Sequence, residues 1–574
     1  MEIQQDSSSE FVIPISYGSS EITQTGKWGF QKPETVFMTA PCQEACPAGI
    51  NIPQFLNFAN EGLYGEALMT ILKESPFPGI CGRVCFHPCE LNCNRAQFDE
   101  SVSIHTMERY ISDATSKEMI ELLPLSAGNS HVAVVGAGPA GLSCAYFLSL
   151  LGHHVTIFEA RKEPGGVMRW GIPGYRLPKS ILKREIQRIL SLPIELKMGI
   201  EIGKDISFDE LSQFDAIFLS PGAGISAPLS IQGKKLGQIR KGGEFLERIN
   251  SKEKIKLGKE TIVIGGGNTA MDVARSALRL GSRVTVAYRR TRDEMPAIKD
   301  EIEEAEGEGV EFRFLIQPVK VDFLKNKRLA VKFKCMKMSR PDQSGRPKAI
   351  PIKGKFITLE TNYLVTAVGE QVDLSWLPEE LIKNQLIERN PSPKIFAGGD
   401  AVDQPRTIVT AIGAGKRAAI SIDSFLRGND EDSILSKIRV GNKGSLSMEA
   451  YLQGRENGDW PEAKRVVPYE EINTLFFEPS KRARVRKRNR DRVLKNFSEV
   501  NLGYGAKEAK FSASRCFSCG TCNYCYNCYY FCPEGVISLD PAQRARTVDF
   551  DHCKGCGTCA KACPRSVVEM RELP

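Results

Sequence analysis

Apolar residues follow two different spacings along the chain. Between Ile50 and Leu72 they recur with the period of an amphipathic helix, in IPQFLNFANEGLYGEALMTIL. Further along, short apolar strands alternate with glycine-rich turns and helices, first in HVAVVGAGPAGLSCAYFLSLLG and HVTIFEA, and again at 261–289 in TIVIGGGNTAMDVARSALRLG and RVTVAY. This repeated strand–helix–strand unit predicts two Rossmann-like lobes.

The remaining segments are expected to lie around these lobes. KIFAGGD is a strand that ends in a Gly-Gly-Asp turn, and we expect it to close the first lobe before a helix in TIVTAIGAGKRAAISI. Residues 1–40 contain SSS, YGSS and isolated prolines, which predicts an irregular arm. Residues 429–510 are polar, and their basic run Lys481–Lys495 is expected to form a solvated helix face.

Length and charge narrow the class of protein. A chain of 574 residues is too long for one hydrophobic core and predicts three or four domains. It has no run of about 18 apolar residues, and Met1–Tyr17 lacks the features of an export signal, so we expect a cytoplasmic protein without membrane contact. The net charge of +8 is modest for this length and favours an acidic docking partner over nucleic acid.

The positions of the cysteines indicate that the chain binds metal clusters. All but two of the 18 cysteines lie in two short regions, Cys42–Cys93 and Cys516–Cys563, and the long middle holds only Cys144 and Cys335. A disulfide scaffold is small and secreted, whereas bunched cysteines in a large chain indicate cluster ligation. Cys144 and Cys335 stand alone and are expected to be buried small hydrophobes.

The C-terminal cysteines form two runs of the pattern C-x2-C-x2-C-x3-C-P, which is typical of ferredoxins with two 4Fe–4S clusters, here called cubes. In that pattern the fourth cysteine of each run binds the other cube. We therefore predict one cube on Cys522, Cys525, Cys528 and Cys563 and another on Cys553, Cys556, Cys559 and Cys532. A zinc site would be expected to use spaced pairs instead.

The first glycine-rich turn has the dinucleotide fingerprint G-x-G-x-x-G. Gly136, Gly138 and Gly141 supply its glycines, and Pro139 and Ala140 open a helix whose amides would face a pyrophosphate. The second strand ends at Glu159-Ala160, and an acid there is placed to bind ribose hydroxyls.

The second turn reads G-x-G-x-x-A, through Gly265, Gly266, Gly267, Asn268, Thr269 and Ala270. No acid follows its second strand; Arg289, Arg290 and Arg292 stand there instead. Guanidinium groups suit a 2′-phosphate, which favours NADPH over NADH. Alternatively, these arginines are exposed charges at the end of a strand.

Residues 40–425 resemble the small (beta) subunit of glutamate synthase. They are also similar to the N-terminal half of dihydropyrimidine dehydrogenase and to the large subunit of NADH-dependent ferredoxin:NADP oxidoreductase. The motifs that carry the resemblance are CQEACPAGINIPQF, GRVCFHPCELNC, VAVVGAGPAGL, PGGVMRWGIPGYRLP, VIGGGNTAMDVAR, YRRTRDEMPA and AGGDAV.

The resemblance implies FAD in the first lobe and NAD(P)H in the second, near Gly265 to Asn268. The implied FAD contacts are Gly136 to Gly141, Glu159, Gly165, Gly166, Arg176, Gly399 and Asp400, with a helix from Thr407 facing the isoalloxazine.

The resemblance also implies two cubes in the N-terminal domain, one of them held by three cysteines and a side-chain oxygen. By motif, that cube corresponds to Cys46, Cys85, Cys89 and Glu108, with Cys81 as a spare or substitute ligand. Glu108 could instead be a surface carboxylate.

The other family cube needs a C-x-x-C pair before Cys42, and this chain lacks it. The stretch that leads into the pair in the family recurs here before Cys516 and Cys519. We predict that these two cysteines join Cys42 and Cys93 in a composite cube. If they are free thiols, the chain holds three cubes rather than four.

Together these features predict an oxidoreductase that moves electrons between NAD(P)H, FAD and several cubes, with the flavin converting a two-electron hydride into single electrons. No acid–base residue is needed. The electrons would pass to or from a partner protein, such as a glutamate synthase, a 2-oxoacid oxidoreductase or a dissimilatory sulfite reductase, in a homodimer or a hetero-complex. A free-standing ferredoxin:NAD(P) oxidoreductase is the alternative, and a nucleic-acid-binding or scaffold protein is a third.

The expected class is therefore α/β and multidomain. We expect an N-terminal arm and helical iron–sulfur domain (1–125), an FAD-binding lobe in two parts (126–240 and 376–428), an NAD(P)H-binding lobe (241–375), a connector (429–510) and a ferredoxin-like α+β domain with two cubes (511–574).

Overall fold

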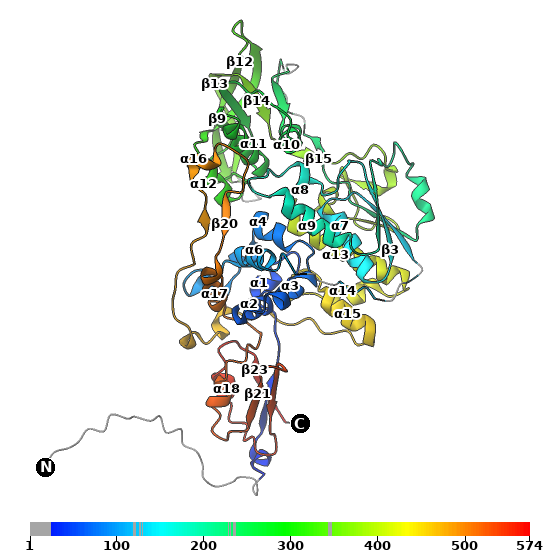
Figure 1. Cartoon of the computed structure of the whole chain (residues 1–574), viewed down its shortest axis with the longest axis vertical. Helices are drawn as coiled ribbons and strands as arrows, with labels where there is room; N and C mark the ends of the chain where they lie inside the picture. The colour runs from blue at the N-terminus through cyan, green and yellow to red at the C-terminus, as the bar shows by residue number, and fades with distance from the viewer. Residues whose placement is uncertain are drawn as a thin grey trace, which may run out of the picture.

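The computed structural model describes residues 24–118, 122–125, 128, 130–227, 229, 231–233, 237–341 and 347–573. Figure 1 shows two lobes that contain sheets, a central helical domain, and a small domain that projects beyond it and holds the C-terminus. The arrangement confirms the predicted α/β multidomain class. Within the described residues, no helix is both long and apolar enough to cross a bilayer.

The first lobe has a five-stranded parallel sheet in the order β18-β5-β2-β3-β4. Its elements are β2 (His131–Val135), α7 (Pro139–Leu150), β3 (His154–Glu159), α8 (Val167–Trp170), α9 (Lys179–Ile189), β4 (Ile194–Met198), β5 (Ala216–Leu219), β18 (Ile395–Ala397) and α13 (Ile408–Leu426). The strand of KIFAGGD returns to this sheet as β18, beside β5, as the sequence predicts. Because helices cover the sheet, its central strands are almost continuously apolar.

The second lobe has a parallel sheet in the order β10-β9-β8-β14-β7 and an antiparallel sheet, β11-β12-β13. Its elements are β7 (Ile239–Lys241), α10 (Gly242–Asn250), β8 (Glu260–Ile264), α11 (Asn268–Arg279), β9 (Arg283–Tyr288), α12 (Lys299–Glu308), β10 (Glu311–Phe314), β11 (Ile316–Phe323), β12 (Leu329–Pro341), β13 (Pro347–Thr361) and β14 (Tyr363–Thr366). The chain enters and leaves this lobe through β6 (Ile225–Ser226) and β15 (Glu370–Gln371), which pair with each other. The second lobe packs around a hydrophobic core of its own.

The helical domain contains α1 (Pro41–Glu44), α2 (Ile52–Glu61), α3 (Tyr64–Leu72), α4 (Pro78–Val84), α5 (Pro88–Leu91) and α6 (Ile104–Ala114). The helical spacing at Ile50–Leu72 thus forms α2 and α3. Asn51 caps α2 by accepting a hydrogen bond from the Gln54 amide, and Gly62 ends the helix in the left-handed region. One hydrophobic core runs from this domain into the first lobe, which joins the two firmly.

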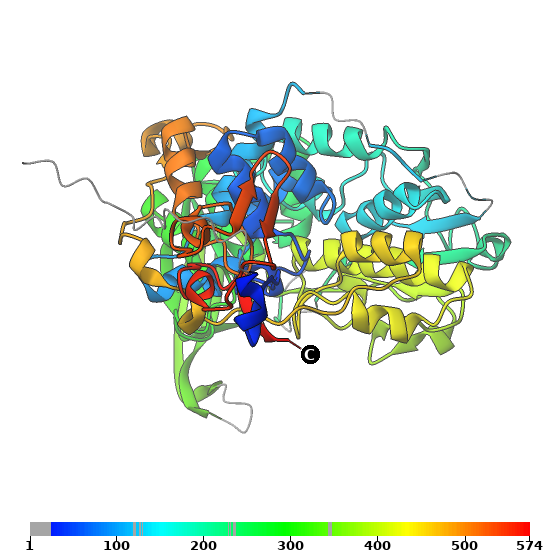
Figure 2. The same cartoon turned by 90° about the horizontal axis from the view of Figure 1, so that it is seen from below.

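The small C-terminal domain contains α18 (Asn527–Tyr530), β21 (Ile537–Asp540), β22 (Ala545–Val548), α19 (Thr558–Lys561) and β23 (Val568–Glu572). Helix α17 (Ala506–Ser514), which precedes it, packs against α2 and α6 of the helical domain. The prediction of an irregular arm over 1–40 is wrong for its described part, because β1 (Gln31–Thr35) pairs antiparallel with β23. Figure 2 shows this N-terminal segment beside the last strand. Residues 1–23 lie outside the described residues.

Residues 481–504, here called the strap, run from the helical domain along the second lobe and back to α17 (Figure 1). The strap contains β19 (Arg486–Lys487), α16 (Arg490–Val493) and β20 (Asn501–Gly503). The predicted helix over Lys481–Lys495 is therefore wrong except for the single turn α16, whereas most of the basic side chains are exposed, as the prediction of a solvated face requires. Arg482 pairs with Glu90 of the helical domain at 2.5 Å, and Lys487 pairs with Glu304 of α12 at 2.8 Å. Before the strap, α14 (Glu431–Lys437) and α15 (Met448–Asn457) pack against α13.

Candidate redox site

The first glycine-rich turn has the close packing that a dinucleotide-binding loop needs. A Cβ on Gly141 would lie 1.9 Å from the carbonyl oxygen of Gly136, so a side chain would separate helix from strand. A Cβ on Gly138 would meet nothing within 4 Å, which leaves this backbone open to a ligand at the N-terminus of α7. The Glu159 carboxylate accepts hydrogen bonds from the Ala137 amide at 2.8 Å and the Arg161 amide at 2.9 Å.

Residues from distant segments meet at this turn. Gly166 packs so closely that its Cβ would lie 2.8 Å from the Cα of Gly138, and the Gly165 amide donates to Ala137. A Cβ on Gly399 would contact that of Ala140 at 3.1 Å. Asp400 follows, and burial raises the pKa of its carboxyl while Arg406 acts in the opposite direction. These contacts fit an extended dinucleotide that lies across α7.

The helix that the resemblance places at the isoalloxazine is α13. Thr407 caps it, because its hydroxyl accepts a hydrogen bond from the Thr410 amide at 3.1 Å. The N-terminus of α13 begins a few residues after the Gly399–Asp400 turn, and the amides of its first turn carry partial positive charge.

The second turn is arranged in the same way around α11. Asn268 begins the helix, and its side-chain oxygen accepts a hydrogen bond from the Ile298 amide at 2.9 Å. The Tyr288 ring covers Gly266, where an added Cβ would lie 2.6 Å from it, whereas Gly267 is open except for Pro296 at 3.9 Å. Thr269 lies in the first turn of α11.

The three arginines expected near a 2′-phosphate differ in their surroundings. Arg289 is exposed and Arg290 half-buried directly after β9. Arg292 forms an ion pair with Glu306 of α12. The geometry therefore leaves Arg289 and Arg290 better placed than Arg292 to reach a nucleotide.

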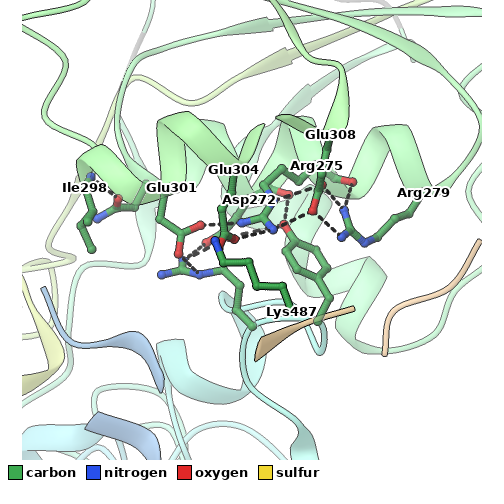
Figure 3. A network of polar contacts seen from close by, with 11 residues as sticks. Asp272, Arg275, Arg279, Ile298, Glu301, Glu304, Glu308 and Lys487 are labelled. Carbon is green, nitrogen blue, oxygen red and sulfur yellow. Dashed lines mark hydrogen bonds and ion pairs between the residues drawn. The ribbon is translucent and has the colours of Figure 1, made fainter. Parts of the chain in front are cut away.

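Arg176 lies in an ionic network between the lobes. Its guanidinium pairs with Asp272 of α11 at 2.9 Å and with Glu301 of α12 at 2.8 Å. Figure 3 shows this network, in which Glu301, Glu304 and Glu308 of α12 face Arg275 and Arg279 of α11 while Lys487 approaches from the strap. Sequence reasoning placed Arg176 at the flavin and missed these partners, because no local pattern connects residues so far apart in the chain.

The C-terminal cysteines gather in two pockets. Cys522, Cys525, Cys528 and Cys563 line one, and Cys532, Cys553, Cys556 and Cys559 line the other. These are the two sets that the ferredoxin pattern predicts. Arg546 lines the first pocket, and two of its guanidinium nitrogens are buried without a protein partner. The Val567 amide donates to the Cys563 sulfur at 3.5 Å. A negatively charged sulfur cluster fits such donors.

A third set of sulfurs joins the two ends of the chain. Burial raises the pKa of the Cys42 thiol well above its usual range, and the nearby sulfurs of Cys93, Cys516 and Cys519 raise it further. Burial also raises the pKa of Cys516 to about 11. The Ser518 amide donates to the Cys516 sulfur at 3.3 Å. Four sulfurs close enough for their charges to interact suit a metal cluster, which binds them as thiolates.

A fourth set lies beside the first lobe and contains Cys46, Cys81, Cys85, Cys89 and Glu108. Burial is the main cause that raises the pKa of each of these five groups, and Glu108 raises the pKa values of Cys46, Cys81 and Cys85 further. Glu108 is fully buried, and its Oε1 has no hydrogen-bond partner. The alternative that Glu108 is a surface carboxylate is therefore wrong. Its free oxygen fits a metal ligand, and Cys81 lies close enough to compete.

Sequence reasoning did not single out His87, Glu90 and His105, whose ligand atoms lie within 4.8 Å of one another. The two imidazoles are stacked with ring centroids 4.2 Å apart. Glu90 already accepts hydrogen bonds from His105 at 2.7 Å and from Arg482 at 2.5 Å. The group therefore holds the strap against the segment that carries Cys85 and Cys89.

Comparisons with protein families agree with this geometry. Residues 130–415, with an overlapping match at 103–171, fit the model of the pyridine nucleotide-disulphide oxidoreductase family. The chain belongs to this family. Residues 37–120 match dihydropyrimidine dehydrogenase domain II with its 4Fe–4S cluster, and residues 521–567 match a 4Fe–4S dicluster domain. The chain is thus an iron–sulfur flavoprotein oxidoreductase that binds FAD, NAD(P)H and 4Fe–4S clusters.

Curated relatives confirm the resemblance to the glutamate synthase small subunit. The chain is 35% identical over 520 residues to "NADP(+)-dependent formate dehydrogenase subunit beta" of Moorella thermoacetica, covering 84% of this chain and 71% of that protein. It is 35% identical over 541 residues to "NADPH-Fe(3+) oxidoreductase subunit beta" of Geobacter sulfurreducens, covering 86% and 77%. It is 32% identical to "Glutamate synthase [NADPH] small chain" of Escherichia coli, covering 67% and 88%.

The two lobes lack the dithiol that disulfide-reducing members of this fold use. Only Cys144 and Cys335 lie between Cys93 and Cys516 in the sequence. Cys144 is fully buried on α7, and Cys335 is half-buried on β12 of the other lobe. The sequence between Cys93 and Cys516 therefore holds no C-x-x-C dithiol.

Proposed function

We propose that this chain is the electron-transferring subunit of a larger redox enzyme. In this role the second lobe would hold NADPH and the first lobe FAD, which would accept the hydride, and four cubes would carry single electrons to a partner protein that docks at the C-terminal domain. Binding, orientation and potential tuning are the work of the protein, whereas the cofactors supply the electron chemistry. The relatives named as beta subunits support a partner, because each of those names describes one subunit of an enzyme.

The observation that carries this proposal is the position of the composite set. Cys42 and Cys93 belong to the helical domain beside the first lobe, and Cys516 and Cys519 begin the C-terminal domain. A cube on these four residues would stand between the cube at Cys46 and the two ferredoxin-type cubes. The route from flavin to surface would then be continuous along the chain's own cofactors.

Arginines and one carboxylate hold the two halves of the composite set together. Arg95, two residues after Cys93, donates through Nη1 to the carbonyl of Arg515. Asp99 accepts hydrogen bonds from Arg95 at 2.6 Å and from Arg515 at 3.0 Å. All three side chains are buried or nearly so. The segment before Cys516 is thus fixed against the segment after Cys93 by bonds that need no metal.

Iron analysis of anaerobically purified protein tests the composite cube. We expect about sixteen irons per chain, and about four fewer in Cys516→Ser and in Cys42→Ser. Cys335→Ser is the matched control and should keep the full content. Unchanged iron in both test variants would reject the composite cube and leave three.

The partner is tested by purification from the native host under anaerobic conditions. A second redox subunit that co-elutes with the chain supports the subunit role. Isolation of the chain alone, together with fast NADPH-dependent reduction of added ferredoxin, would instead support a free-standing ferredoxin:NAD(P) oxidoreductase.

A further inference from the structure

Lys416 is a fully buried cation on α13. Its Nζ donates to the carbonyl oxygen of Ala48 at 2.5 Å and forms an ion pair with Glu74. Ala48 lies two residues after Cys46, so Lys416 fixes the loop that follows this cysteine. A buried lysine costs desolvation energy, and an unneeded one would be easily replaced by an apolar residue. We therefore expect the positive charge of Lys416 at this position to have a function.

Close packing brings α13 against the same loop. A Cβ on Gly413 would lie 2.2 Å from the carbonyl oxygen of Pro47, and one on Gly415 would lie 2.3 Å from that of Ala140 on α7. The helix thus touches the first nucleotide turn on one side and the Cys46 loop on another. From Thr407 to Lys416 the helix rises only about 13 Å at 1.5 Å per residue. One rigid helix therefore links the flavin site to the set around Cys46.

The counter-ion Glu74 has other hydrogen-bond partners besides Lys416. Glu74 also accepts hydrogen bonds from the Ser447 hydroxyl at 2.8 Å and from the Met448 amide at 2.9 Å, at the start of α15. Its negative charge is therefore shared with a helix N-terminus. The ammonium group of Lys416, by contrast, lies directly against the backbone of the Cys46 loop.

We propose that Lys416 is a positioning residue that holds the Cys46 loop against α13 and places a fixed positive charge beside the cube at Cys46, Cys85 and Cys89. This proposal rests on the proposed function, because it assumes a cube at that set. When one electron passes from the reduced flavin to that cube, its net charge becomes more negative by one. A buried cation favours the more negative state, so Lys416 raises the cube's reduction potential and directs electrons away from the flavin.

Redox titration followed by electron paramagnetic resonance tests the charge. Cys89→Ser first identifies the signal of this cube. In Lys416→Met the ratio of reduced to oxidised cube at a fixed potential should fall about tenfold, which is ~59 mV for one electron. Glu74→Gln should shift the midpoint in the opposite direction, because it removes the negative partner. Lys416→Arg should keep the wild-type midpoint.

Lys437→Met is the matched control, because this exposed lysine of α14 loses the same charge in contact with water. Its midpoint should not move. Equal midpoints in wild type, Lys416→Met and Glu74→Gln, or shifts of both variants in one direction, would overturn the role of Lys416. If Lys416→Met fails to take up iron, the direction of the Glu74→Gln shift decides. A Cys89→Ser protein with unchanged iron and signals would instead reject the cube itself, and with it the proposed function.

Discussion

At the scale of single residues, ion pairs between residues far apart in the sequence hold segments of the chain together. No local sequence pattern predicts these pairs. Asp99 is the clearest case, because it binds arginines from both halves of the composite set. Burial opposes ionisation of Asp99, but hydrogen bonds from Arg95 and the Ser480 amide outweigh it and lower the pKa of Asp99 to about 2. The carboxylate therefore stabilises the folded chain at neutral pH.

Asp99→Asn should lower the free energy of unfolding by about 3 kcal/mol at pH 7, because it leaves buried arginine charge without its partner. The usual pKa of Asp is about 3.9. Because the folded value is lower, the stabilisation is complete above about pH 4 and is lost as the pH falls toward about 2. Anaerobic urea unfolding at pH 7, 5 and 3 measures the difference in unfolding free energy between wild type and Asp99→Asn.

The exposed pair of Glu201 with Lys204 gives the control, and Glu201→Gln should lower the free energy of unfolding by under about 1 kcal/mol at each pH. A difference for Asp99→Asn that does not shrink at pH 3 would contradict this account.

Arg289→Ala should raise the KM for NADPH about tenfold or more and leave the KM for NADH unchanged, since a charged hydrogen bond to the 2′-phosphate is worth about 1.5–3 kcal/mol. Steady-state oxidation of both nucleotides with a viologen acceptor measures the two values. Arg292→Ala is the comparison and should have less effect, because Glu306 already holds that guanidinium. Equal losses for both nucleotides would reject a phosphate role for Arg289.

At the scale of elements, helices α11 and α12 are joined by buried ions rather than by apolar contact alone. Glu308 accepts hydrogen bonds from Arg275 at 2.7 Å and from Arg279 at 2.6 Å, and both guanidinium side chains are fully buried. Arg279 also lies over the Tyr175 ring of the first lobe, 3.8 Å from its centroid. The network therefore fixes α11 against the other lobe.

Glu308→Gln should destabilise the second lobe by about 3–5 kcal/mol, because two buried arginines lose their common partner. Lys487→Met removes a half-exposed ion pair at the edge of the same network and should cost under about 1 kcal/mol. Differential scanning calorimetry of the anaerobic proteins compares the two. Similar melting of both variants would mean that the buried ions contribute no more than a surface pair.

Elements that a short stretch of sequence specifies could be predicted. Elements that form only by contact with residues far away in the sequence could not. The two strand–turn–helix units and the cysteine runs each lie within a short window, so their periods and spacings specify α7, α11 and the ferredoxin-type sets. The strand β1 contains a proline and four charged or polar residues, and only pairing with β23 makes it a strand. The strap was missed for the same reason, because Arg482 finds Glu90 almost four hundred residues away along the chain.

At the scale of the whole molecule, the strap is held mainly by polar contacts and by the segments at its two ends. Its small apolar cluster consists of Val493, Val500 and the neighbouring Phe497 packed against Tyr175. The proposed composite cube would add to the Arg95–Asp99–Arg515 contacts that fix the chain after α17, which follows the strap. Removal of iron should therefore loosen this region before the lobes.

Anaerobic treatment with an iron chelator should speed tryptic cleavage within the strap at least about tenfold, because local opening there breaks few apolar contacts. Cleavage at Lys327, in the exposed turn between β11 and β12, is the internal control and should keep its rate. Mass spectrometry of the fragments over time measures both. Equal acceleration at the two sites would indicate general unfolding rather than release of the strap.

The pairing of β1 with β23 has a consequence for biosynthesis. Lys32 stands opposite Arg571, so the first of these strands leaves the ribosome long before its neighbour exists. At about 5–20 residues per second, the wait is roughly 30 to 100 s. The last iron-binding module can only close once translation has nearly finished, and the thiols near the start of the polypeptide must stay reduced until then.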